Sequence, residues 1–314
     1  MRLKNDNMKK VEFIKRLEND YNFKGPLHFT DYSNLKSIFD SGYLSSREDC
    51  CDSNTKFLNG SDDSIINKTS KNVKECVRFY YKECSYTLYS NEGIKKSNVS
   101  PHLPIPVYLL FDKDIMLHED AIYSDGCAGS SYSSFGNDFS FLENIKWDIV
   151  FSRGSISYGL PNYERCEVKR IRQAELLMRL PVDLKYLKKV IFRSKCDYKR
   201  AINDFGKCDL FTFDRSLFHC NNNFVRNYKV IYDEVNNGIE VKIRLNKYDF
   251  NDYIYYYSII DKNHREIKTK NKIIKENPDK QTFSIFIENY NDDWSVFRFY
   301  INNIICIDES IKSQ

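Results

Sequence analysis

The chain has 314 residues, of which 41% are hydrophobic and 29% are charged, and its formal net charge is +4. This length supports one large or two modest domains with buried cores, and the balance is typical of a soluble globular protein. No segment approaches the roughly 18 consecutive apolar residues of a membrane span, and residues 1–10 lack the apolar core of a signal peptide. We therefore expect a cytoplasmic protein that makes no contact with a membrane.

The first third of the chain alternates short predicted elements with polar segments. Apolar spacing predicts a helix over residues 9–20, a strand over 27–30 and a helix that begins near Asp31 or Ser33 and ends at Gly42. This strand, turn and helix place His28 and Thr30 at a strand end, beside the free N–H groups of a helix start. Residues 48–75 are polar and predict a long surface segment.

Further along, β-branched and aromatic runs predict strands, and polar stretches predict loops. Residues 126–136 predict a flexible loop, 139–150 a helix, and 152–168 a loop that presents aromatic and basic side chains. The remaining expected elements are strands at 77–81, 107–111, 170–178, 189–192 and 208–213, with short helices around 86–88 and 198–205.

The pattern of apolar and polar residues changes past residue 220. Five segments, 228–232, 239–245, 253–260, 282–288 and 295–301, alternate apolar with polar residues and are separated by Asn, Asp and Gly turns. Short strands at this spacing predict a small all-β sandwich. We expect two domains, residues 1–220 and 221–314.

The ten cysteines are scattered, include the adjacent pair Cys50 and Cys51, and form no C-x-x-C or Cys/His metal spacing. We therefore expect reduced thiols. The run His118, Glu119 and Asp120 resembles a set of metal ligands, but adjacent loop residues rarely converge on one ion, so we expect no metal.

The positive charge is concentrated in one region. Residues 221–314 contain 14 basic and 14 acidic residues, whereas residues 153–200 contain 13 basic and 5 acidic ones. This local excess would attract a polyanion such as nucleic acid, although an ordinary solvated basic face would have the same composition. Glu175 lies within this region, at the start of an apolar run. Because a buried carboxylate needs partners, Glu175 is either a structural ion-pair residue or a working group.

Three blocks of sequence together resemble one enzyme family. They are Leu27-His28-Phe29-Thr30 with Asn34, Leu35 and Ile38; residues 77–81 with Ser85, Leu88 and Tyr89; and Arg172-Gln173-Ala174-Glu175-Leu176-Leu177. In order and approximate spacing they are similar to the successive signatures of the DarT family, which transfers ADP-ribose from NAD to a base of nucleic acid. The similarity covers roughly residues 25–218.

The resemblance implies an α+β fold with an ADP-ribosyltransferase-like split β-sheet, flanking helices and NAD as substrate. It implies that Glu175 is catalytic, because a carboxylate stabilises the positive charge that develops on the ribose and can accept the proton of a base nitrogen. By position it implies further contacts. The NAD contacts are His28, Thr30, Asn34, Tyr80 and Tyr81; those to a single-stranded acceptor are Tyr158, Tyr163, Arg165, Arg170 and Arg172.

One departure from the family pattern concerns a cation. The family carries an arginine between the first and second blocks that contacts NAD phosphate, and residues 48–77 contain none. We place Arg47 in the NAD site, but Lys56, Lys68 and Arg78 are alternatives that no spacing separates from it. A lysine would lack the bidentate geometry of a guanidinium.

Each assignment has a structural alternative. His28 could be a strand-end histidine with its hydrogen bonds satisfied, and one of Tyr80 and Tyr81 should face the core, since strand neighbours point to opposite faces. Tyr158, Tyr163 and Arg165 could be loop packing rather than a platform for bases. For function, we favour modification of single-stranded DNA, then RNA, in a toxin or anti-phage effector. An antitoxin or a phage protein would then bind residues 221–314. Transfer to protein side chains and a catalytically decayed binding module are the alternatives.

Overall fold

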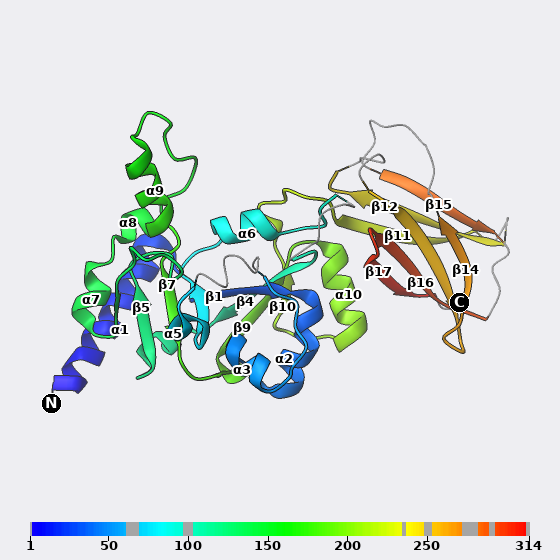
Figure 1. Ribbon diagram of the computed structural model, residues 1–314. Coiled ribbons are helices and arrows are strands. Elements are labelled where there is room, and N and C mark those ends of the chain that lie inside the picture. The colour runs from blue at the N-terminus through cyan, green and yellow to red at the C-terminus, as the bar shows by residue number, and fades with distance from the viewer. Residues whose placement is uncertain are drawn as a thin grey trace. The chain divides into compact units, whose positions relative to one another are not determined.

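The computed structural model describes residues 2–60, 69–96, 103–233, 237–247, 253–271, 282–288 and 293–311, and only the backbone of 2–5 and 268–271. The chain divides into two compact units, which are Met1–Ser90 with Val107–Val190, and Asn91–Pro106 with Ile191–Gln314. The division lies before residue 220 because helix α10 (Lys195–Phe205) belongs to the second unit. Its Cys196 thiol and Arg200 guanidinium bond the carbonyls of Cys306 and Ile305. Figure 1 shows the elements of both units.

The first unit is a mixed α+β structure built on one large sheet. Its strands follow each other in the order β9-β4-β1-β3-β7-β5-β6. They are β1 (Leu27–Asp31), β3 (Val77–Tyr80), β4 (Pro106–Phe111), β5 (Ala121–Ser124), β6 (Phe135–Gly136), β7 (Glu175–Met178) and β9 (Leu187–Phe192), with a small separate pair β2 (Tyr43–Leu44) and β8 (Val182–Asp183). The helices are α1 (Arg2–Tyr21), α2 (Leu35–Ser41), α3 (Arg47–Asp52), α5 (Lys71–Lys74), α6 (Tyr86–Asn91), α7 (Phe139–Asn144), α8 (Trp147–Val150) and α9 (Asn162–Ile171), with 3-10 turns η1 (Tyr32–Asn34), η2 (Lys113–Leu117) and η3 (Leu184–Tyr186).

The register of β3 and β7 decides which side chains share a face. The strands are antiparallel, with Tyr80 opposite Glu175 and Arg78 opposite Leu177. Because directly opposed residues point to the same face, Arg78, Tyr80 and Glu175 lie on one side of the sheet. Phe79 points to the other side, where its ring meets Phe111 edge-on with centroids 5.2 Å apart.

Helix α1 covers the part of the sheet that contains β5 (Figure 1). Its Phe13, Ile14 and Leu17 are buried, and Lys10 lies 5.4 Å from the ring centroid of Tyr123 on β5. After the helix the chain turns through Gly25, whose φ is 135°. A Cβ there would lie 2.1 Å from the carbonyl oxygen of Phe111, so only glycine lets β1 approach β4 this closely.

The predicted end of α2 is confirmed, because Gly42 ends the helix with a φ of 73°. The predicted start is wrong: Asp31 accepts a hydrogen bond from the Ser33 amide and so caps the 3-10 turn η1, whereas α2 begins at Leu35 after Asn34.

Two predictions around the third block are wrong in their boundaries. Residues 162–171 form helix α9 rather than loop and strand, and β7 begins only at Glu175. The helix is stabilised by Glu164 in its first turn and Arg170 in its last turn, which complement the helix dipole, and by the Arg170–Glu167 ion pair. The helix expected over 139–150 is divided into α7 and α8, because Ile145 has extended backbone.

The second unit contains the expected all-β structure. Two antiparallel sheets, β11-β12-β15 and β14-β13-β16-β17, share one core that includes Val241, Ile285, Phe297 and Phe299. The strands are β11 (Val225–Asp233), β12 (Gly238–Leu245), β13 (Tyr255–Asp261), β14 (Glu266–Asn271), β15 (Thr282–Glu288), β16 (Trp294–Ile301) and β17 (Ile304–Ser310), preceded by β10 (Phe211–Phe213) and the turn η4 (Arg215–Leu217). The alternation predicted five of these seven strands. It missed β14, whose sequence has a single apolar residue, and β17, which begins with four apolar residues in a row.

Candidate active site

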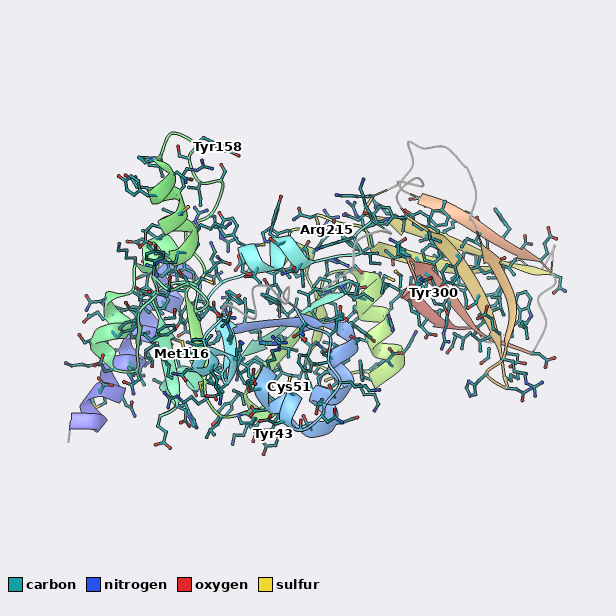
Figure 2. All side chains as sticks on the ribbon, viewed as in Figure 1. Tyr43, Cys51, Met116, Tyr158, Arg215 and Tyr300 are labelled. Carbon is teal, nitrogen blue, oxygen red and sulfur yellow. The ribbon has the colours of Figure 1, made fainter. Side chains whose placement is uncertain are left out.

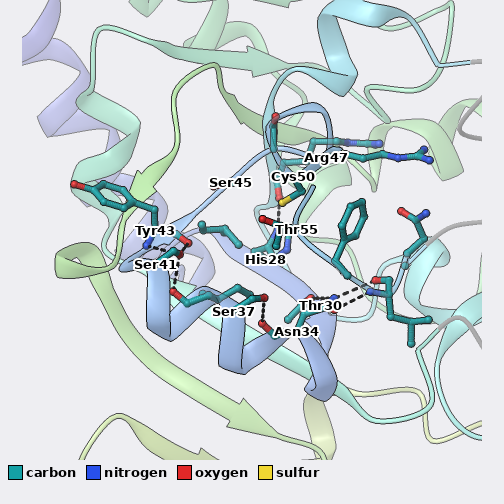
Figure 3. Close-up of a pocket in the computed structure, with 18 of the residues that line it drawn as sticks. His28, Thr30, Asn34, Ser37, Ser41, Tyr43, Ser45, Arg47, Cys50 and Thr55 are labelled. Atoms are coloured by element: carbon teal, nitrogen blue, oxygen red, sulfur yellow. Dashed lines mark hydrogen bonds between the residues drawn. The ribbon is translucent and has the colours of Figure 1, made fainter. Parts of the chain in front are cut away.

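A cleft of about 570 Å³ opens in the first unit beside β1 and β3. Its lining combines polar side chains of helices α2 and α3 with residues from the two strands, and Figure 3 shows part of it. The lining includes His28, Phe29, Thr30, Asn34, Ser37, Ser41, Arg47, Cys50, Leu58, Arg78, Tyr80 and Thr87. This volume is within the range of ligand pockets, and the mixture of aromatic and polar groups suits a nucleotide.

The cleft lies where β1 and β3 separate. Leu27 of β1 pairs with Tyr80 of β3. The neighbouring His28 bonds β3 through its side chain, with Nδ1 2.9 Å from the carbonyl oxygen of Arg78. A carbonyl only accepts, so Nδ1 carries the proton and Nε2 is left as an acceptor. Burial, and then the nearby Arg78 cation, lower the pKa of His28 to about 4, so the ring is neutral at pH 7.

Glu175 is fully buried and is held by an ion pair with Arg78. The Nε and Nη2 atoms of Arg78 lie 2.6 and 2.8 Å from the two carboxylate oxygens, and the amide of Ala128 donates to Oε1 at 3.0 Å. Burial lowers the pKa of Arg78, but the adjacent carboxylate outweighs it and raises the pKa. Arg78 is 31% exposed and lines the cleft. Glu175 is not part of the described lining and lies behind Arg78, to which it is paired.

Asn34 joins the first block of sequence to the loop after α3. Its Nδ2 donates to the hydroxyl of Thr30 at 2.9 Å and to the carbonyl of Leu58 at 3.0 Å, and its Oδ1 accepts from the Leu58 amide at 2.8 Å. Thr30 and Asn34 both line the cleft, and their contact with NAD stays a prediction. Asn34 acts mainly to fix the cleft wall, since its polar atoms are already engaged (Figure 3).

The structure places two of the four candidate cations at the cleft. Arg47 and Arg78 line the cleft, Lys56 is exposed and is absent from the described lining, and Lys68 lies outside the described residues. Nη1 of Arg47 is buried and has no hydrogen-bond partner among the described residues. A buried donor without a partner is costly, so Arg47 is suited to a ligand anion.

Tyr80 and Tyr81 face in opposite directions. Tyr80 lines the cleft and stacks on Phe29 with ring centroids 5.3 Å apart. Burial, followed by the Glu175 carboxylate, raises the pKa of Tyr80, which keeps the phenol neutral. Tyr81 packs edge-on against Trp147 at 4.8 Å and does not line the cleft.

Three of the expected acceptor contacts lie on α9 and the loop before it. Tyr158 and Tyr163 are 84% and 72% exposed, and Figure 2 shows Tyr158 on that loop. The guanidinium of Arg165 lies 4.9 Å from the ring centroid of Tyr158, and its Nε is buried without a partner among the described residues. An exposed tyrosine beside a cation can stack a base and contact its phosphate.

The other two, Arg170 and Arg172, are engaged in structure. Arg170 bonds Glu167, Asp125 and the Ser133 hydroxyl. Arg172 donates to Ser152 Oγ at 2.9 Å and to the Gly154 carbonyl at 2.8 Å.

Lys82 is a further cation beside Arg172 and Ser152, and the sequence did not indicate it. Its Nζ donates to the Ser152 carbonyl at 2.6 Å, and burial, then neighbouring Arg172, lower the pKa of Lys82 to about 8.

Other contacts of the site were also not predicted. Oε1 of Gln173 accepts from the amide and the hydroxyl of Thr87, at 3.2 and 3.1 Å, and so joins α6 to the third block. The Gln-x-Glu spacing of the block was the only available signal. In the described part of the chain, no group of three His, Cys, Asp or Glu side chains is placed to hold a metal, and no helix is long and apolar enough to cross a membrane.

Solved structures with a similar fold come from two bacterial sources. A structure of Thermus sp. 2.9 DarT in complex with ADP-ribosylated ssDNA aligns with a TM-score of 0.50 and 14% identity, over 63% of this chain and 97% of that one. Thermosipho africanus DarTG in complex with ADP-ribose aligns with a TM-score of 0.50 and 17% identity, over 68% of this chain and 54% of that one. A further structure, of Thermus sp. 2.9 DarT in complex with NAD+, has a TM-score of 0.46 and 14% identity, over 62% and 98% of the chains.

A comparison with curated protein sequences gives no match. The family model for DarT, described as ssDNA thymidine ADP-ribosyltransferase, matches residues 27–230. This range includes all three blocks, both strands of the cleft and the Arg78–Glu175 pair. The chain belongs to the DarT family.

Proposed function

We propose that this chain transfers ADP-ribose from NAD+ to a thymidine base of single-stranded DNA, with Glu175 as the catalytic carboxylate. The observation that carries the proposal is the pair of Arg78 and Glu175 at the wall of the cleft, in a chain of the DarT family. It supports a site in which a cation and a carboxylate are available together to a dinucleotide.

The cleft offers partners for the pyrophosphate and for the nicotinamide riboside of NAD+. Arg47, whose buried Nη1 has no partner among the residues that the structure describes, and Arg78 suit the pyrophosphate, since guanidinium groups bind phosphate oxygens in bidentate fashion. Nε2 of neutral His28 is an acceptor for a ribose hydroxyl or the nicotinamide amide. The stacked rings of Phe29 and Tyr80 form an apolar wall for the nicotinamide.

Binding of the pyrophosphate would change the partners of Glu175. In the structure both carboxylate oxygens are bonded to Arg78, so a phosphate that draws this guanidinium into the cleft releases the carboxylate. A carboxylate freed in a water-poor site is a strong electrostatic group, because little solvent screens it. The ion pair thus keeps the catalyst inactive until the donor is bound.

The reaction breaks the bond between the nicotinamide nitrogen and C1″ of the ribose. The bonding electrons leave with the nicotinamide, and the positive charge that develops at C1″ is stabilised by Glu175. Thymine has one ring N–H, at N3, and this nitrogen forms the new bond to C1″ as its proton passes to the carboxylate. Tyr158, Tyr163 and Arg165 are positioned to hold the single strand.

Incubation with labelled NAD+ tests this function. The full chain is given separate pools of single-stranded DNA, RNA and protein, and oligonucleotides with one thymidine or none. We expect label only in thymidine-containing DNA, and none with Glu175→Gln. Label that survives nuclease but is lost to protease would instead identify a protein acceptor.

The burial of Glu175 favours one alternative, a binding module without catalysis. If wild type binds NAD+ but labels no pool, and Glu175→Gln binds it equally well, that alternative is correct.

A role as a toxin follows from the proposed chemistry. N3 lies on the base-pairing edge of thymine, so its modification would block copying of the strand. Induced expression of the wild type, and not of Glu175→Gln, should arrest growth. A restraining antitoxin or a phage protein bound through residues 221–314 stays a prediction.

A further inference from the structure

The second unit contains a basic groove of about 620 Å³, separate from the cleft of the first unit. We define it by its charged and aromatic lining. Seven of its residues are basic, and none of the described lining residues is acidic. These seven are Arg193, Lys195, Arg215, Arg226, Lys229, Lys242 and Arg244, and Arg215 is labelled in Figure 2.

The groove was not visible in the composition. Residues 221–314 have equal numbers of basic and acidic residues, so the sequence indicated no charge surplus there. Four of the seven cations nevertheless come from this segment, because β11 and β12 place Arg226, Lys229, Lys242 and Arg244 in the same groove. The fold therefore gathers basic residues of a segment without net charge into one groove whose described lining contains no acidic residue.

The strand register places like charges against each other. Lys229 lies directly opposite Lys242, and Asn227 lies opposite Arg244. Like charges at directly opposed positions of an antiparallel pair are destabilising. Glu240 lies 3.3 Å from Lys242 and offsets one of these charges, but the other cations of the sheet have no ion pair among the described residues. Burial, and then the neighbouring Arg215 and Arg244, lower the pKa of Arg226.

A buried and incompletely bonded arginine lines the groove. Arg193 is 0% exposed, its guanidinium lies 3.8 Å from the ring centroid of Phe224, and its Nη2 donates to the Pro104 carbonyl at 3.2 Å. Its Nε and Nη1 have no hydrogen-bond partner among the described residues. Donors of a buried cation without acceptors are costly, and an anionic ligand would supply the acceptors.

An exposed aromatic ring lies among these cations. Phe213 lines the groove and is 45% exposed, and its ring packs against Tyr198 at 5.6 Å. Cations along a groove with an aromatic platform are the features by which proteins hold single strands, since phosphates meet the cations and a base stacks on the ring. An acidic peptide would use the cations but would leave the ring without a partner.

We propose that this groove is a second binding site for single-stranded nucleic acid, with its cations on the phosphates and Phe213 against a base. This inference goes beyond the proposed function and does not rest on it, since the groove contains none of the residues assigned to transfer. A site of this kind would hold the strand that the enzyme modifies.

Binding of a fluorescent oligodeoxynucleotide to the full chain, without NAD+, tests the proposal. We compare the double variant Lys242→Ala/Arg244→Ala with Lys262→Ala/Arg265→Ala, which removes two exposed cations of the same unit outside the groove. The groove variant should weaken binding about tenfold or more and reduce the slope of log K against log salt by roughly 1.4, the value for two single-strand phosphate contacts. Equal affinity and slope for the two double variants would overturn the proposal.

A second variant separates nucleic acid from other polyanions. Phe213→Ala should weaken binding of the oligonucleotide roughly five- to a hundredfold, as expected for one lost base stack, and should leave binding of an abasic oligonucleotide unchanged. Equal effects on both ligands, or competition by polyglutamate as strong as by the oligonucleotide at matched charge, would show that the groove does not recognise nucleic acid. Neither result depends on catalysis, so the proposed function can fail separately.

Discussion

Two sites of this protein, the cleft of the first unit and the groove of the second, hold their cations in different ways. In the first unit Arg78 is bonded to a fully buried carboxylate through two hydrogen bonds, whereas in the second unit seven cations line a groove without an acidic residue in its described lining. A paired charge stabilises the fold but must be released before it can act on a ligand. A group of cations with few ion pairs costs stability and is ready to bind an anion. The difference indicates a switchable site in the first unit and a permanently open one in the second.

The largest expected effect comes from removing the carboxylate of the paired site. Glu175→Gln keeps the size of the side chain but cannot stabilise the ribose cation or accept the thymine proton, so transfer to DNA should fall about 10²- to 10⁴-fold. Single-turnover transfer of label from NAD+ measures this loss. Glu12→Gln, at an exposed position of α1, is the matched control and should keep wild-type transfer. A Glu175→Gln protein that transfers at the wild-type rate would exclude this carboxylate as catalyst.

Removing the cation instead tests whether the pair holds the fold together. Arg78→Met should destabilise the protein by about 3 kcal/mol, because it leaves the buried Glu175 without its partner. Denaturant unfolding measures this change. The exposed pair of Lys71 and Glu75 gives the control, since Lys71→Met should cost about 0.5 kcal/mol or less. Equal costs for the two variants would mean that burial adds nothing to the Arg78–Glu175 pair.

Arg47 is the cation of the first unit that behaves like those of the groove. Its buried Nη1 lacks a partner in the described part of the chain, so Arg47→Ala should lose a charged hydrogen bond to NAD+ and raise KM roughly 10- to 100-fold with a smaller change in kcat. Steady-state kinetics with varied NAD+ separates the two constants. Lys36→Ala removes an exposed cation of α2 that is paired with Asp40 and should leave KM unchanged. A loss confined to kcat would place Arg47 outside the ground-state contacts of NAD+.

The smallest expected effect is on the pH dependence of stability and concerns His28, whose imidazole ring is kept neutral by burial. Because the pKa of His28 is lowered from 6.5 to about 4, the unfolded chain binds a proton at this residue between those values and the folded chain does not. Stability should therefore decline as pH falls from about 6.5 to about 4. Unfolding midpoints across this range should decline less steeply in His28→Gln, whereas His264→Gln, at an exposed position, should follow wild type. Parallel profiles for all three proteins would contradict a depressed pKa at His28.

Local patterns were sufficient for many elements of the fold. Apolar spacing identified β1 and α2 with its end at Gly42, and alternation identified five strands of the second unit, because these features depend on near neighbours in the chain. The same reasoning failed at α9, where charged residues with weak apolar periodicity form a helix stabilised by its own ion pair. Strands β14 and β17 were missed for a similar reason, since neither alternates apolar with polar residues: β14 has one apolar residue and β17 begins with four in a row.

The sequence by itself determined that Glu175 needed a partner or a task, that three blocks resembled one family, and that four cations were candidates to replace the missing arginine. Only the tertiary structure decided that the partner is Arg78, 97 residues away, that Arg47 rather than Lys56 lines the cleft, and that Tyr80 rather than Tyr81 faces it. It also decided that a segment with no net charge contributes four cations to one groove. These outcomes depend on which distant strands pair and in what register. A shift of one residue exchanges the two faces of a strand, and composition carries no information about that shift.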